Sequence, residues 1–296
     1  MTDLDRILTR LEPALGPRSG AAVPLDGGIT NRNFRVHLGE RDYVVRLNGV
    51  DTALLGISRH AERMAGATAA RLGIAPALAA VDDEGLVTAY VDGCAIDEER
   101  LRREPAPVAR ALRAFHDSGV QLPVRFWVPQ LLDDYAAIVA DRGVELPPEY
   151  DQVRRLARRI GQALPLHEPV PCHDDLLAGN LLQGPDGVLL VDWEYAGMGH
   201  RLFDLGNLAV NNGFDDAAEE RLLTAYHGDA PTAGALAGLK LMRIMSDARE
   251  AAWGVIQGAI SGLEFDFAGY AQSHFDRLGV AMADRRLEGW FDAAST

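Results

Sequence analysis

The pattern H-x-D-x-x-x-x-N, formed by His173, Asp175 and Asn180, is the feature that most constrains how this chain can fold. Two short apolar runs follow it, separated by Gly-Pro-Asp-Gly at 184–187, and Asp192 comes directly after the second run. Apolar runs joined by such a turn predict a β-hairpin that begins at Asn180 and ends just before Asp192. The first strand of a hairpin starts at the end where the second strand finishes, so Asn180 and Asp192 are expected to lie at the same end of this hairpin.

Carboxylate and amide oxygens in this order suit phosphoryl transfer from ATP. The carboxylate of Asp175 is the candidate base for the proton of an attacking hydroxyl, and His173 belongs to the same candidate catalytic segment. Oxygens of Asn180 and Asp192 are the candidate ligands of Mg²⁺, which binds few protein groups and leaves positions for phosphates. Asp and Asn in a loop can also serve only as turn formers, by bonding their own backbone. The order of motif, hairpin and second carboxylate favours the catalytic interpretation.

The composition limits the partners and the compartment of the protein. The 296 residues suffice for two lobes with separate cores. A net charge of −14 disfavours nucleic acid and anionic membranes as partners, and it is compatible with a cationic small substrate. Cys94 and Cys172 are too few for a disulfide framework or a zinc site, and no signal peptide or long apolar run is evident. We therefore expect a cytoplasmic protein without membrane insertion, as a monomer or a homodimer.

Hydrophobic patterning divides the chain into a strand-rich part and a helical part. Strands are expected at 22–25, 34–38, 43–47, 77–81 and 86–90, with helices at 3–11 and 58–72. After a hinge at 91–93, helices are expected at about 97–118, 129–142, 148–163, 200–210, 215–226, 232–262 with a break, and 264–286. This order predicts an α+β, two-lobed protein kinase-like fold. Its small N-lobe, 1–91, would hold a five-stranded antiparallel sheet that binds nucleotide, and its larger helical C-lobe, 92–296, the catalytic loop and substrate pocket.

The first strands of the sheet carry candidate nucleotide-binding residues. Gly27 and Gly28 let the backbone approach an anion closely, so their amides are candidate phosphate ligands, although such a turn is often only a hairpin. Arg46 alternates with two apolar neighbours, which places it on the opposite face, where its guanidinium could clamp phosphate oxygens. Glu62 on the following helix is placed to pair with it. Without the H-x-D-x-x-x-x-N motif downstream, Arg46 and Glu62 could equally be charged residues exposed to solvent at the surface.

Four segments resemble the choline/ethanolamine kinase family, whose members are relatives of the aminoglycoside phosphotransferases. The segments are G-G-I-T-N at 27–31, V-V-R-L at 44–47, V-D-W-E-Y-A at 191–196 and F-D-L-G-N at 203–207. The resemblance implies that the first segment covers the ATP phosphates, which adds Thr30 and Asn31 to the nucleotide-binding residues. It also implies that the second is the nucleotide strand, with Arg in place of the usual kinase Lys, and that Asp204 steadies the catalytic loop by hydrogen bonds.

The late part of the chain is similar to the choline-pocket segment of the same family, at 253–257, 263–267 and 270–271. A quaternary ammonium cannot donate hydrogen bonds, so aromatic faces are its suitable container. Trp253, Tyr270 and Phe265 are therefore candidate substrate residues. Aromatic residues at helical spacing also form ordinary cores, and the resemblance is what favours the pocket interpretation.

Two positions depart from the family pattern in this region. Glu250 stands where the family often has a second Trp, and Asn211 stands where it often has an acidic residue. A carboxylate in place of an aromatic face favours an amine that can donate hydrogen bonds, such as ethanolamine. Both residues are included among the candidate substrate contacts for this reason.

The resemblance thus implies an ATP- and Mg²⁺-dependent kinase that phosphorylates the hydroxyl of choline or a related amino alcohol. An aminoglycoside-type or thiamine-type phosphotransferase is the alternative within the same reaction class. A catalytically silent kinase-like protein that only binds a nucleotide is the alternative outside it, and the presence of Asp175, Asn180 and Asp192 counts against that alternative. Glu194 could touch a second metal ion or form an ion pair at the surface.

Overall fold

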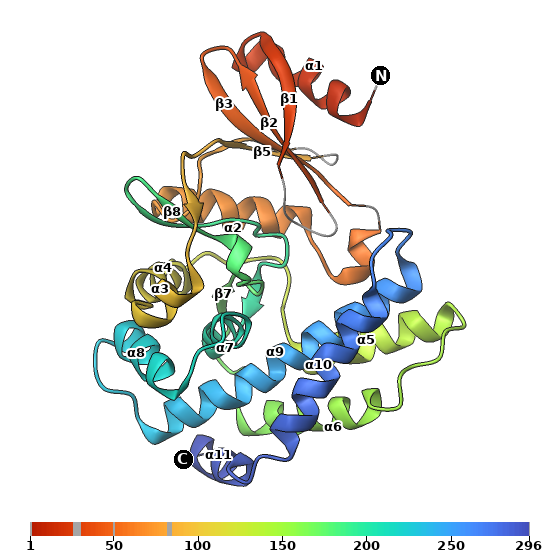
Figure 1. Cartoon of the computed structure of the whole chain (residues 1–296), viewed down its shortest axis with the longest axis vertical. Coiled ribbons are helices and arrows are strands. Elements are labelled where there is room, and N and C mark those ends of the chain that lie inside the picture. The colour runs from red at the N-terminus through yellow and green to blue at the C-terminus, as the bar shows by residue number, and fades with distance from the viewer. Residues whose placement is uncertain (1, 26–30, 50, 82–84, 296) are drawn as a thin grey trace.

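The strand-rich part of the chain folds into a five-stranded antiparallel sheet, as the sequence predicts (Figure 1). The structure is a computed structural model that describes residues 2–25, 31–49, 51–81 and 85–295, so Gly27, Gly28 and Thr30 lie outside the described residues. The strands lie in the order β1-β2-β3-β5-β4. The elements of this part are α1 (Asp3–Leu15), β1 (Arg18–Leu25), β2 (Arg32–Leu38), β3 (Arg41–Leu47), η1 (Thr52–Leu55), α2 (Arg59–Arg71), β4 (Leu78–Val81) and β5 (Gly85–Ala89).

Alternation along β3 gives the sheet an apolar face and a polar face. Val45 and Leu47 are buried in a cluster that includes Ile7 of α1, and Arg46 between them pairs with Glu62 of α2 on the other side. Strand geometry requires this separation, because successive side chains point to opposite faces. One face therefore forms a small core under α1, while the other presents a guanidinium to the rest of the molecule.

The helix α2 begins where its sequence predicts. The hydroxyl of Ser58 accepts a hydrogen bond from the backbone N–H of Ala61 at 3.3 Å, which satisfies one of the free donors of the first turn. This cap starts the helix at Arg59 and places Glu62 in the first turn. The position of Glu62 beneath the sheet therefore follows from a local signal in the sequence.

The second part of the chain is mainly helical and is organised around one long helix (Figure 1). This helix, α9, runs for 28 residues and packs against α5, α6, α7, α8, α10 and α11. The helices here are α3 (Glu98–Arg103), α4 (Ala106–His116), α5 (Val128–Asp141), α6 (Tyr150–Ala163), α7 (Arg201–Asn211), α8 (Asp216–His227), α9 (Ala233–Ile260), α10 (Phe267–Met282) and α11 (Leu287–Ala294). In the described part of the chain, none of the helices is both long and apolar enough to cross a membrane.

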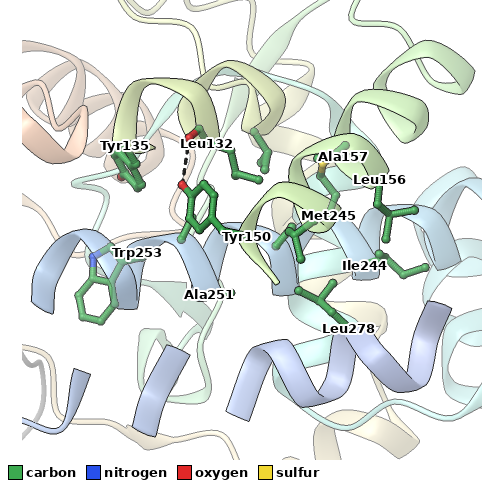
Figure 2. Close-up of a cluster of buried hydrophobic side chains, with 14 of the residues drawn as sticks. Leu132, Tyr135, Tyr150, Leu156, Ala157, Ile244, Met245, Ala251, Trp253 and Leu278 are labelled. Atoms are coloured by element: carbon green, nitrogen blue, oxygen red, sulfur yellow. Dashed lines mark hydrogen bonds between the residues drawn. The ribbon is translucent and has the colours of Figure 1, made fainter. Parts of the chain in front are cut away.

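The core around α9 joins side chains from several helices, as Figure 2 shows. Met245 and Ala251 of α9 belong to it together with Leu156 of α6. The hydroxyl of Tyr150 donates to the carbonyl oxygen of Leu132 at 2.9 Å, so this buried polar group is satisfied. The helix that borders the functional site is thus fixed by packing along most of its length.

Four helices differ from the sequence prediction, and the first of them, expected at 3–11, runs to Leu15. The expected helix at 97–118 is two helices, because Glu104 precedes Pro105 and leaves the helical conformation, with a φ of −130°. The break expected in 232–262 is absent. The expected helix at 264–286 begins at Phe267, where Asp266 caps it, and ends at Met282, before the separate α11.

The predicted catalytic hairpin is confirmed by the strands β8 (Leu181–Gly184) and β9 (Gly187–Leu190). The backbone N–H of Val191 donates to the carbonyl oxygen of Asn180 at 3.0 Å, so Asn180 and Asp192 lie at the same end of the hairpin. Three further short strands were not predicted, and they are β6 (Cys94–Ala95), which pairs with β8, and β7 (Val170–Cys172), which pairs with β10 (Gly197–Gly199).

The helices α7 and α9 touch closely at Gly206. A Cβ atom placed on Gly206 would lie 2.7 Å from the carbonyl carbon of Met242 and 2.8 Å from the backbone nitrogen of Arg243. Side chains do not tolerate contacts this short against a helix backbone. Glycine at this position therefore sets the distance between the two helices.

We expect Gly206→Ala to lower the free energy of unfolding by about 1–3 kcal/mol, because the added methyl must push α7 from α9. Urea unfolding monitored by circular dichroism would measure it. Gly279→Ala on α10 is the matched control, since a Cβ there meets no heavy atom within 4 Å and alanine favours a helix by up to about 1 kcal/mol. Equal stability of the two variants would contradict the assigned role of Gly206.

Candidate active site

A cavity of about 620 Å³ opens between the sheet and the helical part, with the predicted motif in its wall. The β-sheet contributes the side chains of Leu78, Leu86, Thr88 and Arg46 to one wall of the cavity. The opposite wall comes from the catalytic loop, from the end of the hairpin and from α9 and α10, and its polar and aromatic members are Asp175, Asn180, Asp192, Trp193, Glu194, Tyr195, Arg249, Glu250, Trp253 and Tyr270.

The catalytic loop is held from behind by the carboxylate of Asp204. Its two oxygens accept the backbone N–H groups of His173 and Asp174, each at 2.8 Å, and one oxygen also bonds the ring of His116 at 2.9 Å. Asp174 has a φ of 66°, a left-handed conformation that is costly for a residue with a side chain. The Asp204 carboxylate stabilises this strained turn, which agrees with the loop-steadying role expected for it.

A second polar residue of α7 anchors the loop further along. The side-chain oxygen of Asn207 accepts the backbone N–H of Leu176, and its amide donates to the hydroxyl of Ser246 on α9 at 2.9 Å. Both side chains are completely buried. The loop is therefore bonded to two neighbouring positions of one helix, which limits its freedom around Asp175.

The carboxylate of Asp175 lies in the cavity wall with its oxygens partly engaged. One oxygen is 3.4 Å from a guanidinium nitrogen of Arg249, and the other accepts the side-chain amide of Asn180 at 3.2 Å. Burial raises the pKa of Asp175, the carboxylates of Glu250 and Asp192 raise it further, and Arg249 opposes them. A raised pKa suits a group that must take up a proton.

The guanidinium of Arg46 joins the sheet to the end of the hairpin. It pairs with Glu62 of α2, as the sequence predicts, and one of its nitrogens lies 2.7 Å from an oxygen of Asp192. Arg46 is buried, and its charge is balanced by these two carboxylates. Burial also raises the pKa of Asp192, the neighbouring Glu194 adds to this, and Arg46 opposes it.

Glu194 is buried and forms an ion pair inside the protein, not one at the surface. Its carboxylate accepts the guanidinium of Arg59 at 3.2 Å and the side-chain amide of Asn31 at 3.0 Å. Arg59 also reaches Glu62 at 2.9 Å. Asn31 therefore bridges the sheet and the hairpin end, and it does so without lining the cavity.

The oxygens of Asn180 and Asp192 fit a magnesium ion. The amide nitrogen of Asn180 is used in bonds to Asp175, and Arg46 bonds one oxygen of Asp192. Within the described ranges no protein donor bonds the Asn180 side-chain oxygen or the second oxygen of Asp192. Two oxygens in a cavity wall that accept no hydrogen bond from the protein are the kind of ligand that Mg²⁺ prefers.

The end of the cavity beside Asp175 is lined by aromatic and charged side chains of the helical part. The indole N–H of Trp253 donates to the hydroxyl of Tyr195 at 2.8 Å, and the hydroxyl of Tyr270 donates to Glu250 at 2.8 Å. The rings of Trp253 and Tyr270 meet edge to face, with centroids 5.3 Å apart. The structure thus brings together three of the five residues predicted for substrate binding.

The other two predicted substrate residues do not line the cavity. Phe265 is 40% exposed, with its ring centroid 6.1 Å from that of Tyr270, and Asn211 is the last residue of α7. His173 is also absent from the wall, since it is completely buried and its ring lies 4.5 Å from that of Trp193. The motifs in the sequence did not distinguish Phe265, Asn211 and His173 from the predicted residues whose side chains line the cavity.

Sequence reasoning missed Arg249 and Tyr195, which lie at the centre of this end of the cavity. Tyr195 belongs to the D-W-E-Y segment, so its proximity to Asp192 was a usable signal. Arg249 carried no such signal, because an arginine on a helix is usually exposed. Here it is 2% exposed.

The chain is similar to known proteins in sequence and in fold. A sequence profile described as the phosphotransferase enzyme family matches residues 21–239. The human protein named choline/ethanolamine kinase is 26% identical over 88% of this chain and 79% of its own length. A solved structure of a choline/ethanolamine kinase family protein from Mesorhizobium loti superposes with a TM-score of 0.83 at 29% identity over 99% of both chains. The choline kinase LicA from Streptococcus pneumoniae gives 0.80 at 22% identity, over 95% and 99%.

We expect Asp204→Asn to lower the free energy of unfolding by about 3 kcal/mol. The NH₂ group of the asparagine replaces one of the two acceptor oxygens and leaves one backbone N–H of the loop unpaired. Urea unfolding would measure the loss. Asp229→Asn, at an exposed position of the chain, is the control and should leave stability unchanged within about 0.5 kcal/mol. If Asp204→Asn unfolded like the control, the loop would not depend on this carboxylate.

Proposed function

We propose that this chain, which belongs to the phosphotransferase enzyme family, transfers the γ-phosphoryl group of ATP to the hydroxyl of ethanolamine, choline or a related amino alcohol. The observation that carries the proposal is the position of Asp175 in the cavity wall, between the Arg46–Asp192 pair and the side chains of Glu250 and Trp253. The names of the relatives support the same substrate class.

The proposed transfer needs one base and one phosphate-binding end. The hydroxyl oxygen of the amino alcohol attacks the γ-phosphorus, the bond from that phosphorus to the bridging oxygen breaks, and ADP leaves. Asp175 orients the hydroxyl and takes its proton. Mg²⁺, held by Asn180 and Asp192, would supply positive charge against the phosphate oxygens. His173 and Asp204 act behind the loop as positioning residues.

The nucleotide is proposed to bind along the sheet, in the N-lobe formed by residues 1–91. Apolar side chains at Leu78 and Leu86 offer a flat surface for a base. Arg46, kept in place by Glu62, faces the phosphates. The backbone amides around Gly27, Gly28, Thr30 and Asn31 are proposed to bind the same phosphates.

The amine is proposed to bind in the C-lobe, residues 92–296, beside Glu250. The carboxylate of Glu250 is 1% exposed and lines the cavity, and it can accept an N–H of an ammonium group. Trp253 and Tyr270 add aromatic edges and faces on the same side. Both ends of the acceptor, its hydroxyl and its amine, are then held by carboxylates.

A screen of ATP consumption across candidate acceptors tests the substrate class. Ethanolamine and choline should each stimulate ADP release above the rate with water, whereas thiamine and aminoglycosides should not. Turnover with an aminoglycoside or thiamine and with no small amino alcohol would reject the proposal. Nucleotide binding without any turnover would favour a silent kinase-like protein instead.

We expect Asp175→Asn to reduce kcat by at least about 100-fold while ATP affinity stays close to that of the wild type, because the proton acceptor is lost and the nucleotide contacts remain. Asp192→Ala should in addition weaken Mg²⁺-dependent nucleotide binding. Steady-state kinetics and calorimetric titration with ATP and Mg²⁺ would separate the two effects, with Asp229→Asn as the control. Near-normal turnover in Asp175→Asn would remove the proposed base.

A further inference from the structure

The amine end of the cavity already contains a cation of the protein itself. The guanidinium of Arg249 lies over the ring of Tyr195, with its central carbon 4.2 Å from the ring centroid. One of its nitrogens donates to Glu250 at 2.7 Å and lies 3.4 Å from Asp175. Arg249 thus occupies an aromatic face in the wall of the site.

Burial of Arg249 is sustained by the two carboxylates beside it. Burial by itself lowers the pKa of the guanidinium, but Glu250 and Asp175 outweigh it and keep that pKa well above its usual value, so the group is charged. Two other guanidinium nitrogens are buried and bond no partner within the described chain. Two carboxylates beside one guanidinium leave a single negative charge for a substrate cation to balance.

The remaining aromatic groups of this end are committed to contacts within the protein. Trp253 bonds Tyr195 through its N–H, and its ring meets that of Tyr270 edge to face. A quaternary ammonium gains most from open aromatic faces, and Arg249 covers the face of Tyr195. A carboxylate, by contrast, keeps lone pairs for additional donors after accepting one bond at each oxygen.

Building on the function proposed above, we propose that Arg249 is a specificity-determining residue that selects amino alcohols whose nitrogen still carries a hydrogen. An ammonium with an N–H can donate to Glu250 and so offset its repulsion from the nearby guanidinium. A trimethylammonium group has no donor, meets the same repulsion and finds the Tyr195 face covered. Choline is then the poorest acceptor among the N-methylated forms of ethanolamine.

The methylation series of ethanolamine tests this inference in the wild-type enzyme. We would measure kcat/KM for ethanolamine, N-methylethanolamine, N,N-dimethylethanolamine and choline near neutral pH, where the first three are protonated. The largest decrease should come between the dimethyl form and choline, by roughly 10-fold or more, since that step removes the last hydrogen bond to a charged group. A choline value equal to or above the dimethyl value would overturn the inference.

Variants at Arg249 test the residue itself. Arg249→Met should lower turnover for every acceptor, because the residue also contacts Asp175, but it should raise the ratio of choline to dimethylethanolamine by roughly 5-fold or more as the Tyr195 face becomes available. Arg249→Lys, which keeps the charge, should retain the wild-type order. Arg103→Met is the control, since Arg103 pairs with Glu99 at the surface and does not line the cavity.

The outcomes separate this inference from the function on which it rests. Turnover of all four amines with the same ratio in Arg249→Met and the wild type would overturn the role of Arg249 and keep the amino-alcohol function. Turnover of none of them by the wild type would overturn that function. Circular dichroism would show whether Arg249→Met folds. If it does not fold, the kcat/KM values of the wild type and of Arg249→Lys for the four amines still test the inference.

Discussion

Charged groups buried at both ends of one cavity are the constraint on which this structure depends. Arg46 pairs with Asp192 and Glu62 at the sheet, and Arg249 of α9 contacts Asp175 and Glu250. Removing one partner from such a pair costs about 3–5 kcal/mol, whereas an apolar replacement of the whole pair is often neutral. Stability therefore does not account for these pairs. Their position around a cavity indicates that they are retained for the substrates that bind there.

Packing between two helices connects the catalytic loop to the amine end. The helix α7 carries Asp204 and Asn207, which bond the loop backbone, and Gly206 between them allows α9 to approach closely. Because Asn207 also bonds Ser246 of α9, a shift of either helix would move the loop and the substrate wall together. Three positions of one short segment, Asp204, Gly206 and Asn207, thus set both the conformation of the loop and the distance between the two helices.

Patterns within short segments of the sequence predicted the parts of the site whose positions depend on strand alternation, helix capping or a hairpin turn. Strand alternation placed Arg46, a serine cap placed Glu62, and the hairpin brought Asn180 to the same end as Asp192. The missed features depend on contacts between distant segments. Nothing near Arg249 in the sequence reveals that Tyr195 lies under it, and the uninterrupted length of α9 follows from its packing against six other helices.

In the proposed function, substrate choice and phosphoryl transfer use adjacent but different groups of this cavity. Glu250 and Tyr270 would contact the amine, whereas Asn180 and Asp192 would hold the metal ion of the nucleotide. Substitutions at Glu250 or Tyr270 would then change the acceptor preference without loss of the transfer chemistry. Arg249 is the exception, because one nitrogen of its guanidinium faces both Glu250 and Asp175. A substitution there leaves two buried carboxylates uncompensated. Exchange of this arginine for an apolar residue is therefore expected to be tolerated best when Glu250 becomes apolar as well, so that the cavity loses one charge of each sign.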